Sequence, residues 1–122
     1  DIDIGLAGVK WAATLGKPVL YVPGNHEYYT HNISRLEHEM RTLAKETDNV
    51  VFLQNDVQII DSTRFLGTTL WTDYNVFGQP KIAKSYAEYG LTDHRLITHG
   101  YQSPYRFFAP EDAQKVHNRS KF

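Results

Sequence analysis

Three polar side chains follow a short apolar segment near the start of the chain. The segment Val19–Val22 is continuously apolar, a proline and a glycine end it, and Asn25, His26 and Glu27 come next. An asparagine carbonyl binds a divalent metal ion without adding charge, and such ions prefer oxygen and imidazole donors. A histidine beside a metal can donate a proton to a developing oxyanion, and a carboxylate can orient it. The pattern indicates metal-assisted hydrolysis or, alternatively, a polar turn with a helix-capping asparagine.

The flanking residues place this triplet at a sheet edge. Turn residues on both sides predict that Val19–Val22 is a buried strand, because proline cannot donate to a ladder and glycine permits unusual backbone angles. In layered α/β folds, ligands bind beyond the carboxyl ends of the strands. The first residues, "DIDIG", precede another predicted helix. Their carboxylates, Asp1 and Asp3, are therefore candidate metal ligands.

Hydrophobic periodicity predicts the elements that position these groups. Ser34 and Glu37 predict a capping box near the start of the second helix, and 92–109 is expected to be irregular. The order of helix, strand, helix, strand and hairpin predicts an α/β layered fold. The expected helices are Leu6–Leu15, Ile33–Thr47, a third around Ile82 that ends at Gly90, and a last one from Pro110; the expected strands are Val19–Val22, Val50–Leu53, Val57–Ile60 and Arg64–Leu70.

Composition excludes several classes of protein. The 122 residues are 41% hydrophobic and 22% charged, which suits one globular domain. A net charge of −1 without a basic block argues against a general nucleic-acid-binding surface. The absence of cysteine excludes disulfides and thiolate metal sites. The apolar runs are far shorter than the roughly 20 residues of a membrane span, so we expect a cytoplasmic protein without membrane contacts.

Several segments together resemble a known family. "PGNHEYY" matches a Gly-Asn-His-Glu block, and "DIDIG" fits the second half of a Gly-Asp block. "RFLGTTLWTDYNVFG" and "LTDHRLI" resemble segments common in a bacterial-type branch of the same family. The chain thus resembles the central part of a calcineurin-like metallophosphoesterase, the family that includes purple acid phosphatases and protein serine/threonine phosphatases.

The resemblance implies a fold, a cofactor and a set of site residues. The fold would be a layered β-sandwich flanked by helices, and the cofactor would be two divalent metal ions, Mn, Fe or Zn. Asp1 would bridge the metals, with Asp3 as the alternative, and Asn25 would ligate the second metal. His26 would contact the phosphoryl oxygen or protonate the leaving group, and Glu27 would support the loop. The implied substrate is a phosphoester of unspecified identity.

The chain also departs from the family pattern. The Asp-x-His block expected at the start, the later histidine and the final Gly-His-x-His block are absent. We therefore expect 1–122 to be the central part of a single metallophosphoesterase domain, inactive on its own. The leading hypothesis is metal-dependent hydrolysis of phosphoric esters. The alternatives are a non-catalytic binding or scaffold member of the fold, and a standalone α/β domain in which Gly-Asn-His-Glu arose by chance.

Other residues have two interpretations each. Tyr28 and Tyr29 are either packing residues or substrate-binding residues at the lip of a pocket beside the metal loop. Trp71 and Asp73 follow a predicted strand and are either pocket residues or a core tryptophan and a turn aspartate. His94 is expected at the surface or at a helix cap.

Overall fold

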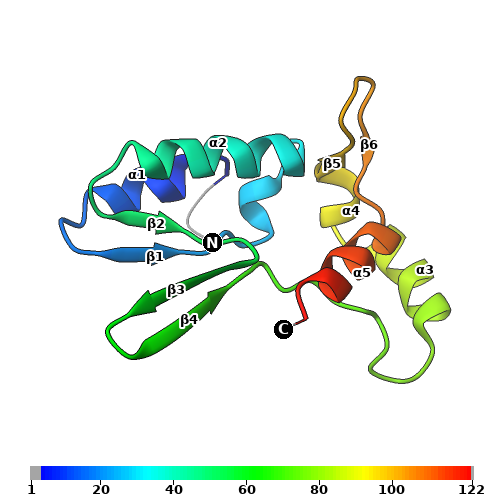
Figure 1. Cartoon of the computed structure of the whole chain (residues 1–122). Helices are drawn as coiled ribbons and strands as arrows, with labels where there is room; N and C mark the ends of the chain where they lie inside the picture. The colour runs from blue at the N-terminus through cyan, green and yellow to red at the C-terminus, as the bar shows by residue number, and fades with distance from the viewer. Residues whose placement is uncertain (1–3, 122) are drawn as a thin grey trace.

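A computed structural model describes residues 4–121 of the chain (Figure 1). Asp1 and Asp3, the expected bridging residues, lie outside these described residues. The mixed α/β class is confirmed, with helices and strands alternating through the first half of the chain. The helices are α1 (Ala7–Ala13), η1 (His26–Tyr28, a 3₁₀ turn), α2 (Ile33–Lys45), α3 (Pro80–Gly90), α4 (Asp93–Leu96) and α5 (Pro110–Arg119). The strands are β1 (Val19–Tyr21), β2 (Val50–Phe52), β3 (Asp56–Ile60), β4 (Thr63–Gly67), β5 (Thr98–His99) and β6 (Arg106–Phe107).

Strands β1 and β2 form a parallel pair joined through α2. Val19 pairs with Val50 and Tyr21 with Phe52, so the two strands end at the same edge. A parallel pair needs a long crossover, and α2 supplies it. Helices α1 and α2 lie along one face of this pair and contact each other (Figure 1). This unit places the loop after β1 at the carboxyl edge of the sheet, as the sequence predicts.

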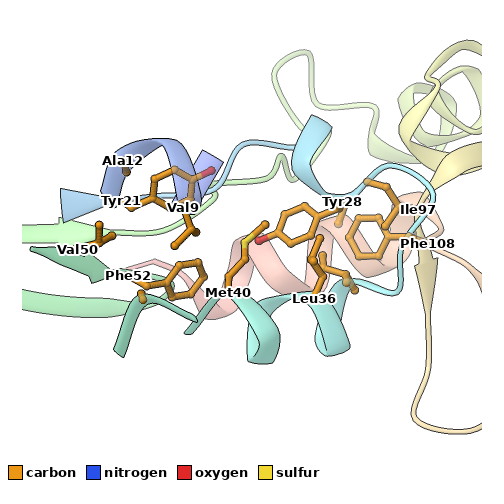
Figure 2. Close-up of a cluster of buried hydrophobic side chains, with 13 residues drawn as sticks. Val9, Ala12, Tyr21, Tyr28, Leu36, Met40, Val50, Phe52, Ile97 and Phe108 are labelled. Atoms are coloured by element: carbon orange, nitrogen blue, oxygen red, sulfur yellow. The ribbon is translucent and has the colours of Figure 1, made fainter. Parts of the chain in front are cut away.

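The core lies between the β1–β2 pair, α1 and α2 and extends toward α5 (Figure 2). The predicted apolar stripe of α2 is buried, and Tyr28 and Phe108 are the largest fully buried side chains. Burying side chains of this size contributes about 2 kcal/mol each before the entropy cost is counted. The core members of α2 are Ile33, Leu36, Met40 and Ala44.

Strands β3 and β4 form the predicted antiparallel hairpin, with Asp56 opposite Gly67. The hairpin projects below the β1–β2 pair in Figure 1 and does not share a sheet with it. Within residues 4–121 the strands form separate two-stranded sheets, so the layered sandwich stays an expectation.

The last third of the chain is more regular than expected. The short helix α4 and the paired strands β5 and β6 lie within 92–109, so the prediction of an irregular segment is wrong. Arg106 donates two hydrogen bonds to the Asp112 carboxylate, at 2.5 and 2.9 Å. These bonds tie β6 to the first turn of α5. None of the helices in 4–121 has the length and apolar character that crossing a membrane requires.

The predicted capping box at Ser34 is also wrong. Asn32 is the N-cap of α2, and its side-chain oxygen accepts a hydrogen bond from the Arg35 N–H at 3.1 Å. The Glu37 carboxylate instead accepts a hydrogen bond from the Tyr28 hydroxyl at 3.2 Å. An asparagine caps a helix as well as a serine does. The Glu37 carboxylate accepts from the buried Tyr28 hydroxyl, which needs a partner, and is not part of the cap.

Candidate functional site

The loop after β1 is held in place by Glu27. Its side chain is 1% exposed, and its two oxygens accept hydrogen bonds from the Tyr21 hydroxyl at 3.1 Å and the Gly24 N–H at 2.9 Å. The Glu27 carbonyl also accepts a bond from the Gly5 N–H at 2.8 Å. Buried carboxylates persist where such donors satisfy them. The supporting role expected of Glu27 therefore has a physical basis in these bonds.

A second residue orients Asn25. Its amide Nδ2 donates a 2.6 Å hydrogen bond to Asp93 Oδ1, from a residue 68 positions further along the chain. An ionised carboxylate only accepts, so the amide nitrogen faces Asp93 and the carbonyl oxygen faces away from it. Within residues 4–121 no group donates to Asn25 Oδ1. That oxygen is available to a cation, as a metal ligand must be.

His26 and Tyr29 lie together at the outside of the loop. His26 is exposed, Tyr29 is half-buried, and their ring centroids are 4.7 Å apart. Partial burial and then the Asp93 carboxylate raise the pKa of Tyr29. Tyr29 packs partly against the core and does not line the pocket described below, so its substrate-binding role stays a prediction.

Tyr28 has the packing role instead. It is 0% exposed, and its hydroxyl donates to Glu37 and lies 3.4 Å from Thr69 Oγ1. Burial, followed by the Glu37 charge, raises the pKa of Tyr28 well above its ordinary value. The expectation that Tyr28 binds substrate at a lip is therefore corrected, because helix α2 and the core cover its ring (Figure 2).

An open pocket of about 550 Å³ adjoins the loop, a size typical of small-molecule sites. Gly24 and Asn25 form one side of it, and Asp93 and His94 form another. His94 is buried, so its expected surface position is wrong. Its Nδ1 lies 2.6 Å from the Phe108 carbonyl and its Nε2 lies 2.9 Å from the Tyr74 hydroxyl.

Trp71 and Asp73 have separate roles. Trp71 lines the pocket and packs against Phe108, with ring centroids 4.8 Å apart. Asp73 accepts a hydrogen bond from the Asn75 N–H at 3.0 Å, and this bond with the nearby Lys121 and His117 charges lowers its pKa. Asp73 does not line the pocket. The structure thus favours a pocket tryptophan and a turn aspartate.

Asp93 is the residue that the sequence did not identify. It touches the amide of Asn25 and influences Tyr29 and Tyr74 through its charge. A polar pair, Asp93-His94, between the apolar Leu91 and Ile97 was the available signal, because buried polar residues need specific partners.

The described residues do not complete a metal centre. Among 4–121 there is no group of three or more His, Asp and Glu side chains that could hold a metal ion. Asn25 Oδ1 fits a single ligand position, and a divalent ion needs four to six. A metal ion bound by Asn25 would need further donors from outside this set.

Comparisons with known proteins give one relative and no family assignment. The chain is 32% identical over 78 residues to Uncharacterized protein L509 of Acanthamoeba polyphaga mimivirus. The match covers 60% of the chain but only 28% of the viral protein, so the chain spans little more than a quarter of that relative's length. No family model and no solved structure matches the chain.

Proposed function

We propose that the chain is the central part of a metal-dependent phosphoric ester hydrolase of the calcineurin-like metallophosphoesterase type. In the intact domain, a layered β-sandwich flanked by helices would carry a two-metal centre. The observation that supports this most is the position of Asn25. It follows the carboxyl end of β1 in a parallel pair, borders an open pocket, and has its amide oxygen turned away from Asp93.

Each site residue would have a separate role that follows from its surroundings. Asn25 would hold one metal ion through Oδ1, and Asp93 would keep its amide from rotating. His26 is exposed beside the same loop and would donate a proton to the leaving group or a hydrogen bond to a phosphoryl oxygen. Glu27 would fix the loop by its bonds to Tyr21 and Gly24.

The metal ions would supply an activated water and neutralise charge on the phosphoryl group. Asp1 is the bridging residue that the resemblance implies, with Asp3 as the alternative. Mn, Fe and Zn all accept the oxygen and nitrogen donors that this family offers. The substrate would be a phosphoester, and the compartment that we expect is the cytoplasm.

Two variants in the intact domain test this proposal. His26→Ala should lower the rate of aryl phosphate hydrolysis by roughly 100-fold or more, because proton transfer is lost. Its metal content, measured by elemental analysis, should stay at the wild-type level. Asn25→Ala should lower both metal content and rate, because it removes a ligand.

His38→Ala is the matched control, since His38 is exposed on α2 and lies outside the pocket. It should leave rate and metal content unchanged. Equal loss of metal in His26→Ala would show that the imidazole is a ligand. Full activity in Asn25→Ala would contradict the proposal.

A further inference from the structure

The pocket beside Asn25 has walls that suit a planar ring. Trp71 and Tyr74 supply aromatic surface, and Leu70 and Leu91 supply aliphatic surface. Pockets of this kind bind small molecules by burying their apolar faces and orienting them through a few polar groups. Aromatic side chains add favourable ring contacts to that burial.

The charge of the lining excludes an anion from the pocket itself. Asp93 is an acid, and the residues that line the pocket include neither lysine nor arginine. A phosphate placed there would meet a negative carboxylate with no cation to offset it. The pocket therefore suits a neutral or positively charged group, and it lies next to the edge where a phosphoryl group would bind.

A chain of hydrogen bonds determines whether the Tyr74 hydroxyl donates or accepts. The Phe108 carbonyl can only accept, so His94 Nδ1 carries a hydrogen and donates to it. In the neutral imidazole, Nε2 then accepts, and the Tyr74 hydroxyl donates its one hydrogen there. Burial, followed by the Asp93 and Glu111 charges, raises the pKa of Tyr74 to about 12, so the hydroxyl stays protonated at neutral pH. The remaining lone pairs of Tyr74 can only accept.

Two other polar groups of the wall also have accepting positions, whereas the Thr72 hydroxyl, which accepts from the Tyr74 N–H, keeps its own hydrogen. Asp93 accepts from Asn25. The Thr69 hydroxyl lies 2.7 Å from the Pro23 carbonyl, which accepts its hydrogen. The pocket thus combines aromatic walls with acceptors at Tyr74, Asp93 and Thr69, and a ligand that donates to these three residues complements that part of the wall.

We propose that this pocket binds the non-phosphate half of the substrate, a planar ring group that carries N–H or O–H donors and no negative charge. This deepens the proposed function, because the ring would belong to the alcohol part of the phosphoester. Binding of the ring itself needs neither metal nor phosphate. It can therefore be tested apart from catalysis.

Two matched probes test the donor requirement. Adenosine carries an exocyclic amino group, and purine riboside is the same nucleoside without it. We would titrate each into the metal-free 1–122 chain and follow the indole N–H signals of Trp71 and Trp11 by NMR. Trp11 lies on α1 and does not line the pocket, so its signal is the internal control. Adenosine should shift the Trp71 signal saturably and bind about 3- to 10-fold more tightly than purine riboside.

Two variants assign the effect to Tyr74. Tyr74→Phe should reduce adenosine affinity toward that of purine riboside and leave purine riboside binding nearly unchanged. Tyr89→Phe is the matched control, because Tyr89 is exposed and outside the pocket, and it should change neither affinity. Circular dichroism would check that both variants are folded. Trp71→Ala should weaken both probes by removing ring surface.

Three results would overturn the inference. If neither probe shifted the Trp71 signal, the pocket would not bind a planar ring. Equal affinities for the two probes would show that the acceptors do not select a donor. If Tyr74→Phe still bound adenosine more tightly than purine riboside by the same factor, another residue would select the donor. Failure of phosphoester hydrolysis in the intact domain would refute the proposed function and leave the ring measurement standing.

Discussion

Replacing Glu27 by glutamine should loosen the loop that carries Asn25 and His26. The carboxylate is buried and accepts from the Tyr21 hydroxyl and the Gly24 N–H through different oxygens. Glutamine has the same shape but only one accepting atom in its side chain. Its amide nitrogen must then face one of these two donors.

The size of the effect follows from the bond that is lost. A hydrogen bond to a charged group contributes about 1.5 to 3 kcal/mol, and a buried donor without a partner adds to the loss. We expect Glu27→Gln to lower the free energy of unfolding by about 2 kcal/mol. For a chain of this length that corresponds to a fall in Tm of roughly 5 to 10 °C. Urea unfolding followed by circular dichroism would measure both.

A double-mutant cycle with Tyr21→Phe tests whether Glu27 acts through its bond to the Tyr21 hydroxyl. In the phenylalanine background, the glutamine oxygen can face Gly24 and its nitrogen can face the vacated position. The cost of Glu27→Gln should therefore shrink by about 1 kcal/mol, because contacting residues are not additive. Additive effects, or a cost below about 0.5 kcal/mol for Glu27→Gln alone, would refute the role assigned to these bonds.

Three further predictions concern pH, packing and metal. Burial raises the pKa of Tyr21, Tyr28 and Tyr74, so the unfolded chain releases these protons at a lower pH than the folded chain does. The free energy of unfolding should therefore be highest below about pH 10 and should fall as the pH rises further. Urea midpoints measured from pH 9 to 12 should decrease steadily, and a flat profile would contradict this. A Cβ at Gly8 would lie 2.0 Å from the Tyr21 hydroxyl, so Gly8→Ala should lower the free energy of unfolding by about 1 to 3 kcal/mol. Gly90→Ala is the control, because Gly90 has open space around it, and thermal unfolding should show a neutral or stabilising effect. If Gly8→Ala were also neutral, the close approach of α1 to β1 would be wrong. Calorimetric titration of Mn²⁺ into 1–122 should give weak binding, with no turnover of an aryl phosphate; tight binding at two sites with turnover would contradict the expectation of an incomplete centre.

Local sequence patterns were sufficient for most of the fold. Val19–Val22 and Val50–Leu53 were expected as strands, and each forms with one residue fewer. The helix expected over Ile33–Thr47 ends at Lys45, and the last helix begins at Pro110 as expected. These elements depend on periodicity, turn residues and proline placement, which a single sequence contains.

Long-range contacts explain what the sequence did not predict. The partner of Asn25 is Asp93, which lies 68 residues away and carries no local signal of that pairing. The sequence predicts His94 at the surface or at a helix cap, and the residue is buried because Tyr74 and the Phe108 carbonyl satisfy its ring nitrogens. Tyr28 and Tyr29 are adjacent, yet Tyr28 is fully buried in the core and Tyr29 is half-buried against it. The 3₁₀ turn at His26–Tyr28 separates their directions, and neighbouring residue types alone do not specify it.

We propose that the Asn25 amide oxygen is a metal ligand at the carboxyl edge of β1. Paramagnetic broadening by Mn²⁺ in NMR spectra of the 1–122 chain tests it directly. We expect the Asn25 side-chain amide and the Gly24 and His26 backbone amides to lose intensity first, even if binding is weak. Signals from α5, exemplified by Lys115, should remain sharp at the same Mn²⁺ concentration. Broadening that begins elsewhere, as at the exposed Asp61 of the β3–β4 turn, and spares Asn25 would show that Asn25 is not a ligand.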